Sequence, residues 1–282
     1  MAEKRGLAAL LLIAALILAG CGAKEADMPE DTAPAATFAP VSVSPQGRTV
    51  AREEGEEYYP DKDKWVYYFQ YAYPRVSGED YAAAAVNESY QMALEETRHL
   101  VLPMLANEET TSREQTRVRH DFSVKCNNDR LLSILQTRRQ TAESGETLAL
   151  EGMTFDLSGA YAGEALTLRG CILALISEEK AEDMTAEKYP QAAKILAGSS
   201  DEIGERLASA LYPAFLEMQQ QGVCRADVEE DDFEWEFSPA ANFYVNEDGA
   251  VVFFFPPTLL ASPSFDVPQF HYTPAEIEAI LD

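Results

Sequence analysis

The chain has 282 residues, of which 48 are Asp or Glu and 22 are Lys or Arg, so its formal net charge at pH 7 is -26. So acidic a chain repels phosphate backbones and anionic lipid headgroups, which argues against nucleic acid as a partner and favours a cationic one. Hydrophobic residues make up 46% of the chain, with 13 Phe and 13 Tyr, which is ample for one or two packed cores.

The first 20 residues predict a secretory signal. Lys4 and Arg5 form a short basic start, and residues 7–18 form an uninterrupted apolar run. At about 1.5 Å per residue this run is shorter than the roughly 30 Å of a hydrocarbon core, so a membrane span is the weaker interpretation. The next residues, Leu-Ala-Gly-Cys at 18–21, resemble a bacterial lipobox. We therefore predict lipidation of Cys21 and display on the outer face of a membrane; an ordinary signal peptide is the alternative.

A flexible tether is predicted to follow the lipid. Residues 21–57 are rich in Ala, Pro, Thr, Ser and Glu and contain few large apolar side chains. A flexible segment of this length has an r.m.s. reach on the order of 35 Å. We expect this tether to lie between a signal peptide over 1–20 and two folded modules over 58–172 and 173–282.

The first folded element is predicted to be a strand, because aromatic residues alternate along it: Trp65, Tyr67, Phe69, Tyr71 and Tyr73. We expect this face to be core, and a sugar-stacking platform is the alternative. Pro74 should end the strand. A helix from Asp80 to Leu102 should follow, because Ser-Gly-Glu-Asp at 77–80 supplies capping groups.

Two hairpins are predicted next. Residues 117–126 and 131–140 flank an Asn-Asn-Asp turn, whose residues tolerate positive φ. Residues 148–157 and 165–171 flank a Ser-Gly turn and should form the second hairpin.

Helical spacing of apolar residues then replaces the period of two. Helices are predicted over 185–196 and 201–221. Ser199 and Glu202 form a capping-box pattern at the start of the second helix, and Pro213 should kink it.

The remaining elements are a strand over 233–237, a hairpin of 243–245 with 251–255, and a closing helix that begins after Thr273. Strands and helices in separate runs predict an α+β fold. We expect mainly antiparallel sheets with helices packed on one face, in two tandem or intimately joined subdomains.

The cysteines leave one question open. Besides Cys21, the chain contains Cys126, Cys171 and Cys224. In an oxidising exterior an odd number allows at most one disulfide and leaves one thiol over. The sequence does not decide whether two of the three are joined, and without a CxxC spacing a metal knuckle is not expected.

An acidic run at 227–232 is the candidate binding site. Oxygen-rich loops bind calcium, but the EF-hand pattern fails here: its sixth place is not Gly, and Ser238 stands where the bidentate Glu belongs. A solvated loop leading into a strand is the plainer interpretation, and a protein-binding patch is the functional one that we favour. Its candidate residues are Asp227, Glu229, Glu230, Asp231 and Asp232.

No catalytic pattern is recognised. The histidines His99, His120 and His271 are not in an HExxH or similar spacing, and the sequence has no Gly-x-Ser-x-Gly, P-loop or dinucleotide fingerprint. We therefore expect no enzymatic activity, no metal and no cofactor.

The order of elements over residues 60–282 resembles extracellular modules of RsiV-type anti-sigma factors and of the non-catalytic half of PdaC-type peptidoglycan deacetylases. The stretches that carry the resemblance are 73–87, 131–134, 154–159, 166–168, 243–256 and 265–267. Residues 138–145 depart from it, because such proteins tend to have a Gly-Gly-Ala-His-like turn there.

The resemblance implies a function. RsiV-like relatives are receptors for lysozyme, a cationic protein that an acidic domain would suit. Only residues 1–5 precede the apolar run and no catalytic domain follows, so we expect the outer module alone, anchored by lipid. It would act as an extracellular binding or sensing module for a muramidase such as lysozyme, or for peptidoglycan. An accessory envelope lipoprotein without its own ligand and a wall-active hydrolase are the alternatives.

Overall fold

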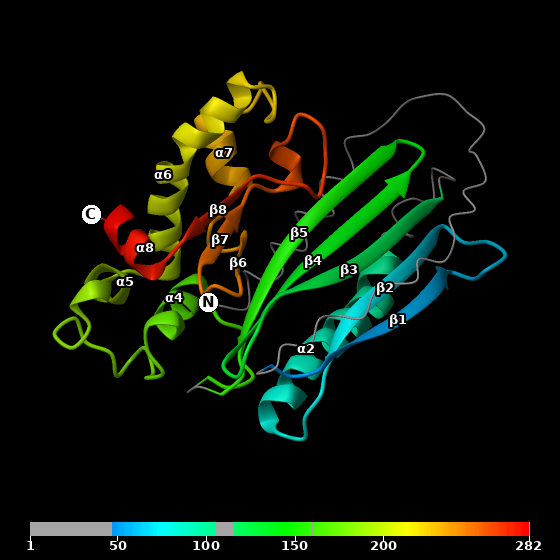
Figure 1. Cartoon of the computed structure of the whole chain (residues 1–282). Helices are drawn as coiled ribbons and strands as arrows, with labels where there is room; N and C mark the ends of the chain where they lie inside the picture. The colour runs from blue at the N-terminus through cyan, green and yellow to red at the C-terminus, as the bar shows by residue number, and fades with distance from the viewer. Residues whose placement is uncertain (1–46, 105–114, 159–160, 282) are drawn as a thin grey trace.

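The computed structural model describes residues 47–104, 115–158 and 161–281 (Figure 1). Within these residues the strands form a five-stranded sheet, ordered β1-β2-β3-β4-β5, and a three-stranded sheet, ordered β6-β7-β8. Helices accompany both sheets, so the predicted α+β class is confirmed. Among the described residues, no helix combines the length and the hydrophobicity that a membrane span requires. Cys21 lies outside the described residues.

The five-stranded sheet forms the N-terminal module. Its strands are β1 (Val50–Tyr59), β2 (Tyr67–Val76), β3 (Thr116–Asn127), β4 (Leu131–Ala142) and β5 (Gly145–Asp156). Neighbouring strands are antiparallel except β2 and β3, which are parallel. The predicted hairpin of 117–126 with 131–140 is confirmed as β3 and β4, and β5 covers most of the predicted strand at 148–157.

Strand β1 corrects the predicted tether, because residues 50–57 form most of it. The sequence suggested solvated chain here, since four of these residues are glutamates: Glu53, Glu54, Glu56 and Glu57. In the structure β1 is an edge strand that pairs only with β2. Charged side chains are common on edge strands because they discourage further pairing.

The predicted end of β2 at Pro74 is also wrong, because the strand continues to Val76. Proline lacks the N–H that a central strand donates to its neighbour. The ladder between β2 and β3 stops at the pair Tyr71 and His120, so Pro74 lies beyond it and faces only β1, opposite Arg52. The sheet therefore loses no hydrogen bond to β3 at this position.

Helix α2 (Tyr81–Glu96) covers one face of this sheet (Figure 1). The Asp80 side chain accepts a hydrogen bond from the Ala83 N–H at 3.0 Å, which confirms the predicted cap. A π-helical turn, Thr97–Val101, extends the helix. Buried α2 residues such as Tyr90 pack on the aromatic face of β2, so its predicted role as core is confirmed for Tyr67, Phe69 and Tyr73.

His120 is held neutral in this core, and we predict that it makes stability depend on pH. Its Nδ1 lies 2.9 Å from the Tyr73 hydroxyl, and its ring packs on Phe69 at 4.9 Å. Burial, with the Arg138 charge, lowers the pKa of His120 to about 3. An unfolded histidine titrates near pH 6.5, so below that pH the unfolded state binds more protons and the stabilisation is progressively lost.

Between pH 7 and pH 5 the wild type should therefore lose about 2 kcal/mol more unfolding free energy than His120→Gln. Urea unfolding of both proteins at the two pH values measures this difference. Parallel pH dependences would show that the imidazole is not desolvated in the folded state.

The C-terminal module contains the remaining elements. They are α4 (Leu168–Ile176), η4 (Pro190–Ala192), α5 (Ala193–Ala197), α6 (Ser200–Gln220), α7 (Glu230–Glu236), β6 (Phe243–Val245), β7 (Val251–Phe254), η5 (Pro257–Leu259), β8 (Gln269–Tyr272) and α8 (Pro274–Ile280). The predicted second helix, the hairpin and the closing helix are confirmed as α6, β6 with β7, and α8.

Two further predictions, for residues 165–171 and 185–196, were wrong in kind or length. The expected strand at 165–171 makes only a single bridge, between Ala165 and Phe155. The Thr167 side chain then accepts from the Gly170 N–H and starts α4, whose apolar residues are buried on several sides. The expected helix over 185–196 is reduced to η4 and the five residues of α5.

The two modules are joined through β6, which packs against β4 and β5. The Val245 N–H donates to the buried Ser133 hydroxyl at 2.9 Å, and that hydroxyl is 2.7 Å from the Thr154 hydroxyl. Leu135 and Leu150, from β4 and β5, belong to the same buried cluster as the C-terminal core. The modules are thus intimately joined rather than separate.

The three remaining cysteines are buried free thiols in the described residues. Burial raises the pKa of Cys126 and of Cys224 to about 11, and that of Cys171 to about 12. At neutral pH they are therefore protonated, unreactive core residues.

Candidate functional site

The predicted acidic run does not form a loop leading into a strand. Glu229 occupies the N-cap position of α7, and Glu230, Asp231 and Asp232 form its first turn. Carboxylates at this end of a helix interact favourably with its dipole, which gives them a structural role. Their side chains nevertheless reach solvent, because all three first-turn residues are exposed.

Asp227 is fixed before the helix by an arginine. The Arg225 guanidinium donates to both its carboxylate oxygens, at 3.2 and 2.9 Å, and holds the pKa of Asp227 below its usual value. Arg225 also lies 3.3 Å from Glu236 Oε1 in α7. Asp227 is therefore already paired, and the unpaired acidic character of the site comes from the helix itself.

Because α7 is a helix, its three aromatic residues do not share a face as a strand would require. Phe233 and Phe237, four residues apart, are 0% and 1% exposed, whereas Trp235 is 72% exposed. Asp231 and Asp232 lie four and three residues before Trp235 and are its neighbours on the helix surface. We call Asp231, Asp232 and Trp235 the acidic–aromatic face.

Sequence reasoning missed Trp235 because it placed this tryptophan in a strand with the two phenylalanines. The acidic residues before Phe233 are a signal for the start of a helix. In a helix, which turns by 100° per residue, Trp235 lies on the side away from the buried Phe233 and Phe237.

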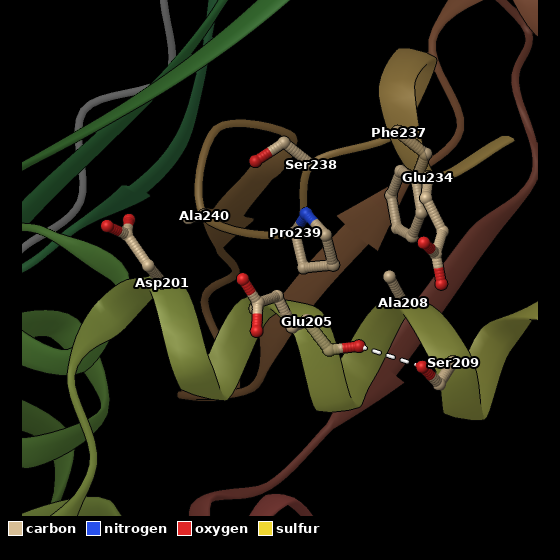
Figure 2. Close-up of a pocket in the computed structure, with 10 residues that line it drawn as sticks. Asp201, Glu205, Ala208, Ser209, Glu234, Phe237, Ser238, Pro239 and Ala240 are labelled. Carbon is tan, nitrogen blue, oxygen red and sulfur yellow. Dashed lines mark hydrogen bonds between the residues drawn. The ribbon is translucent and has the colours of Figure 1, made fainter. Parts of the chain in front are cut away.

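A groove between α6 and α7 adjoins this face (Figure 2). Its volume is about 540 Å³. Asp201 and Glu205 of α6 and Glu234 of α7 contribute carboxylates, and the chain from Phe237 to Ala240 completes the lining. Glu234 follows Asp231 by three residues, so the groove and the acidic–aromatic face meet along α7.

The residues that line the groove favour binding of positive charge. No histidine or cysteine is among the residues that line it. Across residues 47–104, 115–158 and 161–281 there is no group of three His, Cys, Asp or Glu residues that could hold a metal ion. Three carboxylates around one hollow instead favour an ammonium or guanidinium group.

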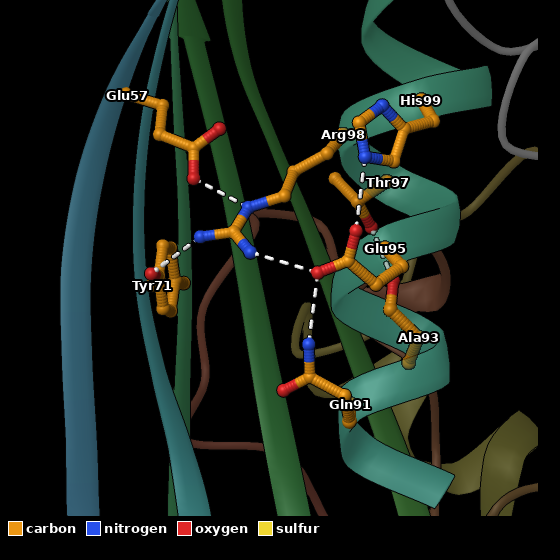
Figure 3. A network of polar contacts seen from close by, with 8 residues as sticks. All are labelled: Glu57, Tyr71, Gln91, Ala93, Glu95, Thr97, Arg98 and His99. Atoms are coloured by element: carbon orange, nitrogen blue, oxygen red, sulfur yellow. Dashed lines mark hydrogen bonds and ion pairs between the residues drawn. The ribbon is translucent and has the colours of Figure 1, made fainter. Parts of the chain in front are cut away.

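A second polar cluster, centred on Arg98, has a structural role (Figure 3). Arg98 donates to Glu57 of β1, to the Tyr71 hydroxyl at 2.8 Å and to Glu95 at 3.1 Å. His99 lies 2.9 Å from the other Glu95 oxygen and is exposed. These contacts tie the end of α2 to the edge of the sheet.

Comparison with known proteins gives a distant neighbour. No protein-family model and no curated protein matches the chain. Among solved structures, the chain is similar to a member of the DUF3298 family from Bacteroides fragilis. That match has 16% sequence identity and a TM-score of 0.43, and it covers 83% of this chain and 93% of the other. The candidate site is therefore built on the geometry of α6 and α7 alone.

Proposed function

We propose that this protein is a lipid-anchored cell-surface lipoprotein that binds a cationic extracellular protein, such as a muramidase, through the acidic–aromatic face and the adjoining groove. The observation that carries the proposal is the exposure of Trp235, at 72%, beside the carboxylates of α7. The resemblance to RsiV-type modules supports the choice of a muramidase.

An exposed tryptophan with acidic neighbours can contribute much of the binding energy of an interface with a cationic protein. Tryptophan is enriched among the few residues that dominate interface energies. Its ring also attracts the ammonium or guanidinium group of a partner, and among aromatic side chains it does so most strongly. Asp231 and Asp232 add negative charges at the rim of this surface, where they would orient a positively charged partner.

The groove extends this surface by offering a place for a basic side chain. Asp201, Glu205 and Glu234 surround a hollow that a lysine or arginine could enter. The net charge of -26 would draw a cationic protein toward the domain and raise its association rate. A lipid on Cys21 would keep this domain outside the cell, where such a protein is encountered.

We predict that Trp235→Ala weakens the affinity for hen lysozyme at least tenfold. Truncation removes the aromatic anchor, and losses at such positions are typically about 2 kcal/mol or more. Isothermal titration calorimetry on residues 22–282, at about 0.15 M salt, measures the effect. Tyr81→Ala is the matched control, because Tyr81 is 75% exposed at the start of α2, away from α7.

Equal affinities for wild type and Trp235→Ala would reject the acidic–aromatic face as the binding site. Binding that is seen at low salt and lost at physiological salt would mean that the acidic chain attracts lysozyme only nonspecifically. If neither lysozyme nor peptidoglycan sacculi are retained, an accessory envelope role without a ligand becomes the better interpretation.

A further inference from the structure

The uncovered face of the five-stranded sheet carries an unusual set of side chains. Residues directly opposite each other in a sheet point to the same face. The register pairs Tyr58 with Tyr68, Tyr68 with Arg117, and Gln70 with Arg119. These positions alternate with the buried Tyr67 and Phe69 and therefore point away from α2.

The C-terminal module leaves this part of the sheet open. It packs on β4 and β5, whose Leu135 and Leu150 enter its core, whereas Gln70, Arg117 and Arg119 are exposed. Figure 1 shows β1 and β2 at the edge of the sheet far from β6. We call this surface the aromatic–arginine platform; it consists of Tyr58, Trp65, Tyr68, Gln70, Arg117 and Arg119.

The aromatic part of the platform is ordered but not buried. The rings of Tyr58 and Tyr68 stack with centroids 4.5 Å apart, and Trp65 meets them edge-on at 6.4 and 6.1 Å. All three remain partly exposed. The Tyr68 hydroxyl donates to Glu56 at 2.5 Å and accepts from the Gln70 amide at 2.9 Å, which fixes the ring.

Basic residues border these rings on the β3 side, whereas Glu56, opposite Gln70, borders them on the β1 side. Arg117 is exposed and makes no ion pair with any of the described residues. Arg119 lies directly opposite Arg139 of β4, and like charges in this position destabilise a sheet. Asp121 and Glu146 offset these two charges in part, at 3.3 and 3.2 Å. Arg139 also packs over the Phe265 ring of the C-terminal module, at 5.4 Å, so Arg117 is the platform arginine without an ion pair among the described residues.

We propose that the platform binds a glycan that bears carboxylate groups. The apolar face of a sugar ring can stack on a partly exposed tyrosine or tryptophan. The Arg117 guanidinium can bind a carboxylate through two parallel hydrogen bonds. The Gln70 amide can form hydrogen bonds with the hydroxyl groups of a sugar. From β1 to β3 the platform spans about 10 Å across the strands, which accommodates a short oligosaccharide.

Charge density separates this ligand from single-stranded nucleic acid, which also combines stacking with arginine contacts. A nucleic acid carries a phosphate on every nucleotide, so a chain with a net charge of -26 repels it strongly. A glycan with a carboxylate on every second sugar has a lower charge density, and the arginines of the platform can offset that repulsion locally.

The test uses residues 22–282 and a hyaluronan octasaccharide, in which every second sugar carries a carboxylate. Saturable binding by titration calorimetry is expected, and Arg117→Gln should weaken it at least fivefold. Tyr68→Ala should weaken it at least tenfold, provided that circular dichroism is unchanged. Arg75→Gln is the matched control, because Arg75 is an exposed β2 arginine outside the platform, and its affinity should equal that of the wild type.

Two further probes test the ligand class. A neutral chitin oligosaccharide of equal length should bind at least tenfold more weakly, and a thymidine octamer should bind more weakly still. No saturable hyaluronan binding, unchanged affinity in Arg117→Gln, or tighter binding of the thymidine octamer would overturn the proposal. Trp235→Ala should leave glycan binding intact, so the platform and the α7 site succeed or fail separately.

Discussion

Phe233→Ala should lower the free energy of unfolding by about 3–5 kcal/mol, the usual loss for truncating a fully buried phenylalanine. Phe233 is 0% exposed, and its ring lies 4.7 Å from Phe215, 5.3 Å from Phe237 and 5.6 Å from Phe255. These side chains come from α6, the end of α7 and the end of β7, so the cavity would open where the helices meet the sheet. Urea denaturation followed by circular dichroism measures the loss.

Trp235→Ala is the control on the same helix. Its side chain is 72% exposed, so its truncation should change the unfolding free energy by no more than about 0.5 kcal/mol. Similar losses in the two variants would mean that Phe233 and Trp235 share a buried face, as in the strand first expected. The contrast therefore tests both the helix and the exposure on which the proposed site depends.

The error at α7 shows why a short aromatic segment is ambiguous. Phe233, Trp235 and Phe237 fit a period of two, and aromatic residues favour strands. The same spacing also puts Phe233 and Phe237 on one helical face, because they are four residues apart. A five-residue window fits both patterns. The helix is favoured by packing against Phe215 and Phe255, and these contacts cannot be read from the local sequence.

Elements with local signals were predicted well. The capping box of Ser199 with Glu202 forms at the start of α6 as expected, and α8 begins after Thr273 as expected, with a capping box between Thr273 and Glu276. The signal for the turn between β3 and β4 is likewise local, because it consists of three consecutive residues, Asn-Asn-Asp. By contrast, β1 and β8 were missed, because β1 is rich in glutamate and β8 has only four residues; β1 pairs with β2, and β8 pairs with β7. Tertiary pairing overrode composition there.

The candidate site could be predicted only in part for the same reason. The five acidic residues form one continuous segment, so their sequence reveals the charge. The groove needs Asp201 and Glu205 of α6 beside Glu234 of α7, and such a juxtaposition depends on the fold. The exposure of Trp235 follows once α7 is known to be a helix, and the sequence pattern pointed to a strand.

Gly152→Ala should destabilise the protein by about 3 kcal/mol, at the upper end for an overpacked core position. A Cβ atom at Gly152 in β5 would lie 1.6 Å from the Phe243 carbonyl oxygen in β6. That oxygen belongs to the backbone, so no rotation of a side chain relieves the overlap. The two strands would have to separate, which would strain the contact between Val245 and Ser133 that joins the modules.

Gly204→Ala provides the control with the opposite sign. At Gly204, inside α6, the nearest atoms to an added Cβ are 3.5 Å away, which is an ordinary contact. Because alanine is favoured over glycine in a helix, this variant should gain up to about 1 kcal/mol. Thermal unfolding of the wild type and of both variants measures the stability lost in Gly152→Ala and the stability gained in Gly204→Ala. A wild-type stability for Gly152→Ala would mean that β5 and β6 do not approach this closely, and that the modules are joined less tightly than their shared core implies.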